Sequence, residues 1–113
     1  MLRTNLKHIE TEEEYNEIIE SNENVMICCG RMGPMCLPVY DVMENMEDKY
    51  DHVKFYDMDF DIPSAHVIKN HESARGFMGL PFTLYFKDGK TVKATTSIQN
   101  KKQIKSILDV YLA

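Results

Sequence analysis

Apolar and polar residues along the chain follow two different periods, which predicts strands that alternate with helices. Short apolar runs at Leu6–Ile9, Val25–Cys29 and Val53–Asp59 are typical of strands. The run at Val25–Cys29 has no polar member, as expected for a strand that is buried on both faces. Each run is followed by a stretch whose apolar residues recur every three or four positions, the pattern of an amphipathic helix.

Capping residues indicate where the helices begin. Thr11 precedes Glu14 by three positions, the spacing of a capping box, and predicts the start of the first helix. The second helix is predicted to begin at Pro34, because proline is favoured in a first helical turn. Its buried face is expected to hold Val39, Val42, Met43, Met46 and Tyr50. A third helix is predicted over Pro63–His71.

The last third of the chain departs from this alternation. Two strand-like runs, Pro81–Phe86 and Thr91–Thr95, flank an Asp-Gly pair, which predicts an antiparallel hairpin. Asn100 is then expected to cap a terminal helix. The order of elements predicts an α/β fold with a mixed sheet, in which parallel strands joined by right-handed crossovers have helices on both faces.

Composition narrows the class of protein. A chain of 113 residues fits one domain, residues 1–113. With 18 acidic and 13 basic side chains the net charge is -5, and no basic stripe is present, so we expect no nucleic acid as a partner. The N-terminus lacks the apolar region of a signal peptide, and no run approaches the ~20 apolar residues of a membrane span. We therefore expect a cytoplasmic protein with no membrane partner.

Candidate chemistry gathers where the central strand meets the second helix. Cys28 and Cys29 end the strand, and Cys36 follows a Gly33-Pro34 turn. Free backbone N–H groups at a helix start stabilise negative charge and lower the pKa of a nearby thiol below its usual ~8.5. We therefore expect Cys36 to be more reactive than Cys28. Strand alternation puts Cys28 and Cys29 on opposite faces, and Cys28 also fits the pattern of a small core residue.

Four short motifs are distinctive in this order along the chain: Gly33-Pro34, Asp57-Met58-Asp59, Gly79-Leu80-Pro81-Phe82-Thr83 and Phe86-Lys87-Asp88-Gly89-Lys90. Together they resemble the motifs of the thioredoxin family, and the resemblance covers essentially the whole chain. The resemblance implies a thioredoxin fold, with a central mixed sheet of about five strands and helices on both faces. It also implies that Pro81 is cis and borders a groove in which Gly33, Pro34, Leu80 and Pro81 dock a peptide.

The chain differs from the family at the redox motif itself. Where thioredoxins have Trp-Cys-Gly-Pro-Cys, this chain has Arg31-Met32-Gly33-Pro34-Met35, and Met26 stands where the family has a buried acid. Methionine cannot form a disulfide, so the ordinary dithiol reaction cannot run at residues 32 and 35. Moving the alignment by one residue places Cys36 on the family's second cysteine, and the sequence does not choose between the two frames.

The first functional hypothesis is a thiol-disulfide oxidoreductase that acts in cell redox homeostasis through an atypical cysteine pair. Cys36 would be the attacking thiolate, and Cys29 would resolve the mixed disulfide. The partners would be protein or peptide thiol and disulfide targets and a reductase that the sequence does not identify. This reaction requires no cofactor. The competing explanation is that both cysteines only pack, and that the fold has kept its shape without its chemistry.

Two alternatives belong to other classes. One is a noncatalytic peptide-binding module whose groove lies beside Pro81. The other is a Cu(I) site, because thioether and thiolate ligands suit soft metals. Its ligands would be Met32, Met35, Cys36 and Met78. A zinc site is disfavoured by the vicinal cysteines. Asp57, Asp59 and Asp61 lack the remainder of a calcium-binding loop and are predicted to form a solvated acidic turn.

Overall fold

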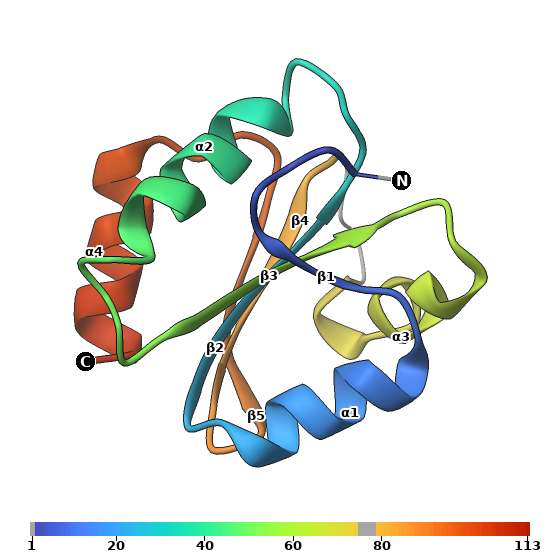
Figure 1. Ribbon diagram of the computed structural model, residues 1–113, viewed down its shortest axis with the longest axis horizontal. Helices are drawn as coiled ribbons and strands as arrows, with labels where there is room; N and C mark the ends of the chain where they lie inside the picture. Colours follow the sequence, from blue (N-terminus) through green and yellow to red (C-terminus); the bar gives the residue numbers. More distant parts are fainter. Residues whose placement is uncertain (1, 75–78) are drawn as a thin grey trace.

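One mixed sheet of five strands forms the centre of the protein (Figure 1). The computed structural model describes residues 2–74 and 79–113. The strands are β1 (Lys7–Ile9), β2 (Asn24–Gly30), β3 (Lys54–Asp59), β4 (Phe82–Lys87) and β5 (Lys90–Thr96), in the spatial order β1-β3-β2-β4-β5. The first three run parallel to one another, and β4 is antiparallel to both β2 and β5. The predicted mixed α/β sheet is therefore confirmed.

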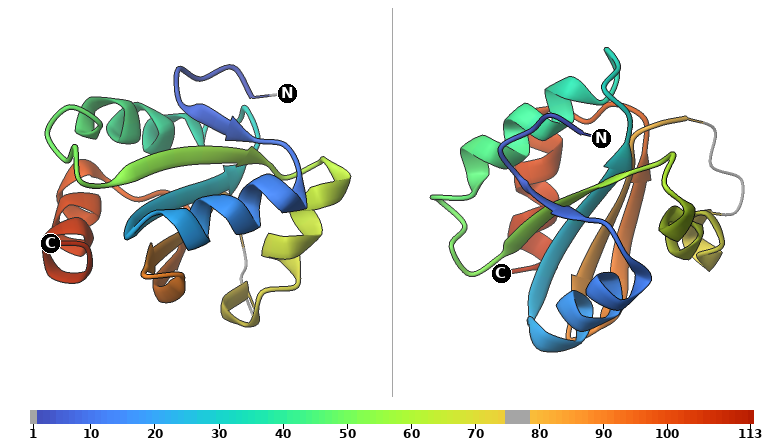
Figure 2. Two further views of the ribbon diagram at one scale, coloured as in Figure 1. Left: turned by 60° about the horizontal axis from the view of Figure 1, so that its bottom comes forward. Right: turned by 45° about the vertical axis from the view of Figure 1, so that its right-hand side comes forward.

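Helices cover both faces of this sheet (Figure 2). On one face lie α2 (Leu37–Met46) and α4 (Lys101–Tyr111), and on the other lie α1 (Glu12–Ser21) and the short α3 (His66–Lys69). The core is divided accordingly. Met26 and Cys28 of β2 pack in the cluster beneath α2 and α4, whereas Cys29 packs in the cluster beneath α1 and α3. Because β2 lies at the centre of the sheet, its residues alternate between these two clusters.

The local signals in the sequence explain the firmest boundaries. The Thr11 side chain accepts the Glu14 backbone N–H at the start of α1. Asn100 and Gln103 form a reciprocal capping box at the start of α4. The turn between β4 and β5 has φ values of 53° at Asp88 and 82° at Gly89, the left-handed conformation that an Asp-Gly hairpin turn uses. Both caps and the hairpin are as predicted.

The second and third helices differ from the prediction. Helix α2 begins at Leu37 rather than Pro34, because the Gly33 carbonyl first accepts the N–H groups of Cys36 and Leu37 in a separate turn. It ends at Met46, which leaves Tyr50 buried beyond the helix. In place of a helix over Pro63–His71 there are two 3-10 turns, η1 (Pro63–Ala65) and η2 (Glu72–Ala74), on either side of α3. A helix as short as α3 is not stable alone and depends on burial of Ile68.

Candidate functional site

The end of β2 brings together three groups that are far apart in the sequence. A Cβ atom placed on Gly30 would lie 2.7 Å from the Tyr40 hydroxyl, 2.8 Å from the Cys36 sulfur and 3.3 Å from Cβ of Pro81. Real Cβ atoms essentially never approach other atoms within 3.0 Å. A side chain at residue 30 would therefore force the Tyr40 hydroxyl and the Cys36 sulfur to shift, because both lie next to the space that it would fill. The Leu80–Pro81 peptide bond, which leads into β4, is cis.

Cys36 lies directly before the first residue of α2, and only 3% of it is exposed. The backbone N–H of Arg31 donates to its sulfur at 3.5 Å. The Tyr40 hydroxyl donates to the Arg31 carbonyl at 3.2 Å and so holds the loop beside the sulfur. Cys36 therefore lies next to the start of α2, close to where the sequence placed it. Its role as the attacking thiol stays a prediction.

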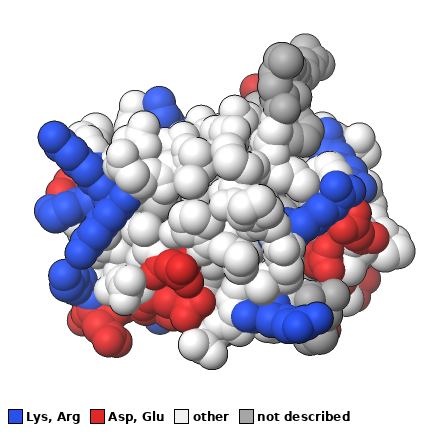
Figure 3. All heavy atoms as spheres, turned by 90° about the horizontal axis from the view of Figure 1, so that it is seen from above, with Lys and Arg blue, Asp and Glu red and all other residues white. Residues whose placement is uncertain are grey.

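The turn before Cys36 presents an uncharged surface. Met32 is 38% exposed and Met35 44%, and Leu37 extends this apolar surface at the start of α2. Figure 3 looks down on this end of the molecule and shows charged side chains at the margins of an uncharged centre. Nothing lies within 4 Å of a Cβ placed on Gly33, so the Gly33-Pro34 turn is open to a partner. These features describe a surface on which an apolar peptide segment can dock.

An exposed ion pair anchors the loop. The Arg31 guanidinium donates to both carboxylate oxygens of Asp61, with two of the contacts at 2.9 Å, and lies 5.2 Å from the centre of the Phe60 ring. The hydrogen bonds from Arg31 lower the pKa of Asp61 below its ordinary value. This pair joins the β2–α2 loop to the segment that follows β3. Its role is to position the loop, because the Arg31 charge is already matched by Asp61.

The three thiols are divided between the two faces of the sheet. Cys29 faces the cluster beneath α1 and α3, and Cys36 belongs to the cluster beneath α2, so the sheet separates these two side chains. Cys28 shares the cluster of Cys36. Burial raises the pKa of the Cys28 thiol well above 9.0 and that of Cys29 to about 12. The Cys29–Cys36 pairing remains a prediction that only oxidised protein can test.

A buried carboxylate close to these thiols was not recognised in the sequence. Asp57 was predicted to lie in a solvated turn, but its side chain is fully buried in β3. His8 Nδ1 lies 2.5 Å from Asp57 Oδ1, and the Thr4 hydroxyl donates to the other carboxylate oxygen. Burial raises the pKa of Asp57, while the contacts with Thr4 and His8 oppose that rise. One signal was available in the sequence: Asp57 lies inside the run Val53–Asp59, which is itself predicted to be a strand.

The proposed Cu(I) ligands are only partly described. Met32 and Met35 are exposed beside the buried Cys36. Met78 lies outside the described residues. Within residues 2–74 and 79–113, no three or more His, Cys, Asp and Glu side chains are grouped to hold a metal ion. In the same part of the chain, no helix is long and apolar enough to cross a membrane.

Comparison with known proteins supports the fold. The chain matches no protein-family model, and no curated protein is significantly similar to it in sequence. Solved structures are similar in shape. A thioredoxin of Plasmodium falciparum has a TM-score of 0.78 at 21% identity, with 94% of this chain and 99% of that chain covered. Thioredoxin O2 of Arabidopsis thaliana has a TM-score of 0.78 at 15% identity, with 99% and 98% covered.

A mutant thioredoxin of Halobacterium salinarum is also similar in structure, with a TM-score of 0.78 at 19% identity and with 100% of this chain and 97% of that chain covered. Strand order, helix placement and these similarities define the chain as a protein of the thioredoxin fold. The predicted thioredoxin fold is confirmed. At such identities the comparisons establish the fold alone, and function must be argued from the site.

Proposed function

We propose that this protein is a thioredoxin-like thiol-disulfide oxidoreductase in which Cys36 is the exchanging thiol. One observation carries the proposal: the Cys36 sulfur lies at the start of α2, against the Arg31 N–H and beside Pro81. This sulfur accepts a backbone N–H and directly follows the turn whose Met32 and Met35 side chains are exposed. The general thioredoxin-like character of the fold supports the same assignment.

The reaction is an exchange of sulfur partners. The Cys36 thiolate attacks one sulfur of a substrate disulfide, so that a mixed disulfide forms and the other substrate sulfur leaves as a thiolate and takes up a proton. A second thiol of this chain then attacks Cys36 and releases the remaining substrate sulfur. Two protein thiols are oxidised to a disulfide, and one substrate disulfide is reduced to two thiols. A dithiol reductant from outside must return the protein to its starting state.

Docking would precede the exchange. The candidate docking residues are Leu80 and Pro81, which form the cis peptide bond beside Gly30, and Gly33 and Pro34 of the open turn before Cys36. An extended peptide placed between them can pair with exposed backbone, as in recognition by strand addition. The exposed thioether side chains of Met32 and Met35 adapt to different apolar partners. We therefore propose protein or peptide disulfides as substrates.

A trapping experiment tests the exchange. Reduced protein is incubated with glutathione disulfide, and its mass is measured before and after dithiothreitol. We expect a reversible loss of thiols in the natural chain and in a Met35→Leu control, and no reaction in Cys36→Ser. If all three thiols of the folded natural chain stay reduced while the unfolded chain reacts, the oxidoreductase proposal is wrong.

The second candidate is a noncatalytic peptide-binding module. It is favoured by Met32 and Met35, which stand where exchangeable cysteines would be and whose apolar side chains are exposed. Binding of apolar, cysteine-free extended peptides can be measured with the Cys36→Ser variant. Tight binding without any thiol reactivity in the natural chain would support this second function over the first.

A further inference from the structure

A row of polar or ionisable side chains crosses the sheet beneath the cysteine loop, one from each strand. In register from one edge to the other, the row consists of His8, Asp57, Cys28, Thr83 and Thr95. Residues paired in register point to the same face of a sheet. Since Cys28 packs beneath α2 and α4, the whole row lies on that face. The opposite face of β2 has no such row: Cys29 lies between Met58 and Phe82.

The Cys36 sulfur stands next to Cys28 along this face. It lies 2.8 Å from the position that a Cβ atom of residue 30 would take, and residue 30 is the next residue of β2 that points to the same side as Cys28. Successive same-face positions of a strand are roughly 6.6 Å apart. No side chain of β2 stands between the two sulfurs, because residue 30 is glycine. Movement of the largely exposed 31–36 loop can close this gap, whereas a bond from Cys36 to Cys29 has to pass around the sheet.

The two cross-strand neighbours of Cys28 suit a thiol that ionises. Asp57 on β3 is a buried carboxylate, and carboxylates accept protons. Thr83 on β4 is 1% exposed, and its hydroxyl has no hydrogen-bond partner within the described part of the chain. A buried hydroxyl without a partner costs roughly 1–3 kcal/mol. A thiolate at Cys28 would supply that hydroxyl with an acceptor, and this hydrogen bond opposes part of the rise that burial causes in the pKa of Cys28.

We infer that Cys28 is the resolving thiol for Cys36 and that Asp57, supported by His8, accepts its proton. The inference rests on the proposed oxidoreductase function. In the resolving step the Cys28 S–H proton moves to the Asp57 carboxylate, and the Cys28 sulfur bonds to the Cys36 sulfur. The bond from Cys36 to the substrate sulfur breaks, and the substrate leaves as a thiolate. The substrate disulfide is the oxidant overall, and the substrate sulfur that was bonded to Cys36 leaves with the electron pair of the broken S–S bond.

Charge balance explains why the proton goes to Asp57. The groups facing Cys28 are Asp57, Thr83, Cys36, Tyr40 and Tyr85. The groups facing Asp57 are Thr4, His8 and Asp59. Two negative charges at neighbouring buried positions repel each other strongly. Transfer of the proton from Cys28 to Asp57 moves one negative charge without creating a second, so the thiolate forms without that repulsion.

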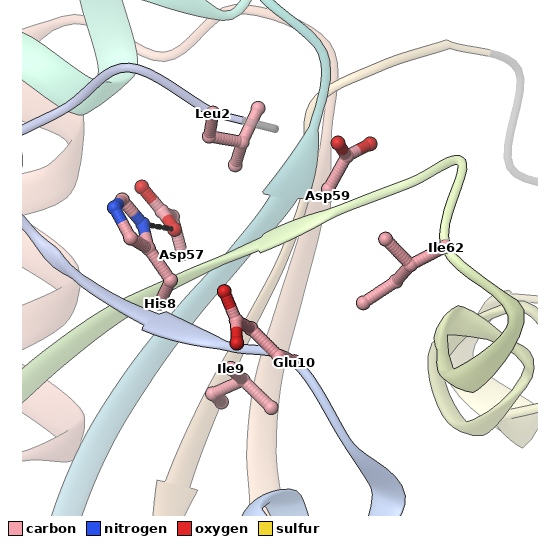
Figure 4. A pocket seen from close by; sticks show the side chains of 7 residues that line it. All are labelled: Leu2, His8, Ile9, Glu10, Asp57, Asp59 and Ile62. Carbon is pink, nitrogen blue, oxygen red and sulfur yellow. Dashed lines mark hydrogen bonds and ion pairs between the residues drawn. The ribbon is translucent and has the colours of Figure 1, made fainter.

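The transferred proton has a route to solvent. Figure 4 shows His8 beside Asp57 at the edge of a cavity of about 230 Å³, whose lining also includes Leu2, Glu10 and Ile62. The His8 side chain is 27% exposed while that of Asp57 is fully buried. His8 can therefore pass protons between the buried carboxylate and water. This arrangement gives the edge strand β1 a function in chemistry that takes place at the centre of the sheet.

Disulfide connectivity tests the inference directly. The natural chain is oxidised with glutathione disulfide, remaining thiols are alkylated at low pH, and fragment masses locate the bond. We expect Cys28–Cys36. Because the two candidates are adjacent, Cys28→Ala and Cys29→Ala are compared as well: the first should stop at a long-lived mixed disulfide on Cys36, and the second should still form the internal bond. Cys28→Ser provides a second variant if Cys28→Ala fails to fold.

The possible failures are distinguishable. A Cys29–Cys36 bond, or persistence of the mixed disulfide only in Cys29→Ala, overturns this inference and leaves the proposed function intact. A chain that forms neither a mixed nor an internal disulfide overturns both. For the proton, the rate of resolution is measured against pH in Asp57→Asn, with the exposed Asp41→Asn as control. We expect Asp57→Asn to slow resolution at neutral pH by roughly 100-fold, with the rate recovering at higher pH. An unchanged pH profile removes Asp57 from the step.

Discussion

Cys28 and Cys29 are adjacent in the sequence and equally buried, but their surroundings differ completely. Cys28 is flanked across the strands by Asp57 and Thr83, whereas Cys29 is flanked by Met58 and Phe82. The first lies beneath α2, where Cys36 is found, and the second lies beneath α1 and α3. Two neighbouring thiols thus belong to different halves of the protein. Successive residues of a central strand point to opposite faces of the sheet, so a shift of one position changes which reactive groups a side chain can contact.

The largest expected difference concerns thiol reactivity. At neutral pH, iodoacetamide should modify Cys36 roughly 100-fold faster than Cys29. Burial raises the pKa of Cys29 from 9.0 to about 12, which lowers its thiolate fraction roughly a thousandfold, and the thiolate is the reactive form. The same effect raises the pKa of Cys28, so that thiol should also react slowly in the reduced protein. Peptide mapping of partly alkylated protein measures all three rates, and equal rates would make Cys36 a structural residue.

A methyl group at residue 30 should overpack the face of the sheet beneath α2 and α4, on which Cys28 lies, and leave the packing beneath α1 and α3 unchanged. Gly30→Ala places a Cβ within 2.7 Å of the Tyr40 hydroxyl and 2.8 Å of the Cys36 sulfur. Overpacking of this kind costs roughly 1–3 kcal/mol of unfolding free energy. Gly33→Ala is the matched control, since its Cβ would have no neighbour within 4 Å. Urea denaturation should show the loss in the first variant alone, and equal stabilities would mean that Cys36 and Tyr40 move aside freely.

Serine substitutions should separate the two faces on a smaller scale. A Cys28→Ser hydroxyl finds Asp57 and Thr83 as hydrogen-bond partners, whereas a Cys29→Ser hydroxyl faces Met58 and Phe82. An unsatisfied buried hydroxyl costs roughly 1–3 kcal/mol. We therefore expect Cys29→Ser to be less stable than Cys28→Ser by about 1 kcal/mol. If denaturant titrations give the reverse order, Asp57 and Thr83 do not provide hydrogen-bond partners for a hydroxyl at residue 28.

The smallest expected effect is a pH dependence of stability. Burial raises the pKa of Asp57 above its ordinary 3.8, so the folded protein holds this proton more tightly than the unfolded chain. The stabilising contribution is complete below pH 3.8 and is lost as the pH rises through the raised pKa, with a slope of at most about 1.4 kcal/mol per pH unit. The stability advantage of the natural chain over Asp57→Asn should therefore fall with rising pH. An advantage that grows instead would mean that His8 and Thr4 outweigh burial.

Most of the fold followed from short-range signals in the sequence. Thr11, Asn100 and the Asp88-Gly89 turn each satisfy a local backbone requirement, so their meaning does not depend on the rest of the protein. The predicted start of α2 at Pro34 was wrong. Proline is compatible with a first helical turn, but Pro34 lies in a separate turn closed by the Gly33 carbonyl. The prediction of a single helix over Pro63–His71 was wrong for a similar reason. Its apolar spacing is helical, and packing of Ala65 and Ile68 supports only short helical pieces.

The candidate site was only partly predictable. Cys36 was recognised because its position at a helix start is a local property. Asp57 was misjudged because its burial depends on β1, which covers its edge of the sheet only after folding. The row that joins His8 to Thr95 is invisible in the sequence, since strand order and register determine it. Long-range register is the information that the apolar pattern lacks.

Gly30 and Cys36 pack against each other at the junction between β2 and α2. The strand leaves an empty side-chain position, and the sulfur of the residue that leads into α2 lies next to it, together with Tyr40 and Pro81. A sulfur that bonds to a substrate needs more volume than this closely packed space provides. Under the proposed function, a mixed disulfide on Cys36 therefore requires the start of α2 and the end of β2 to move apart.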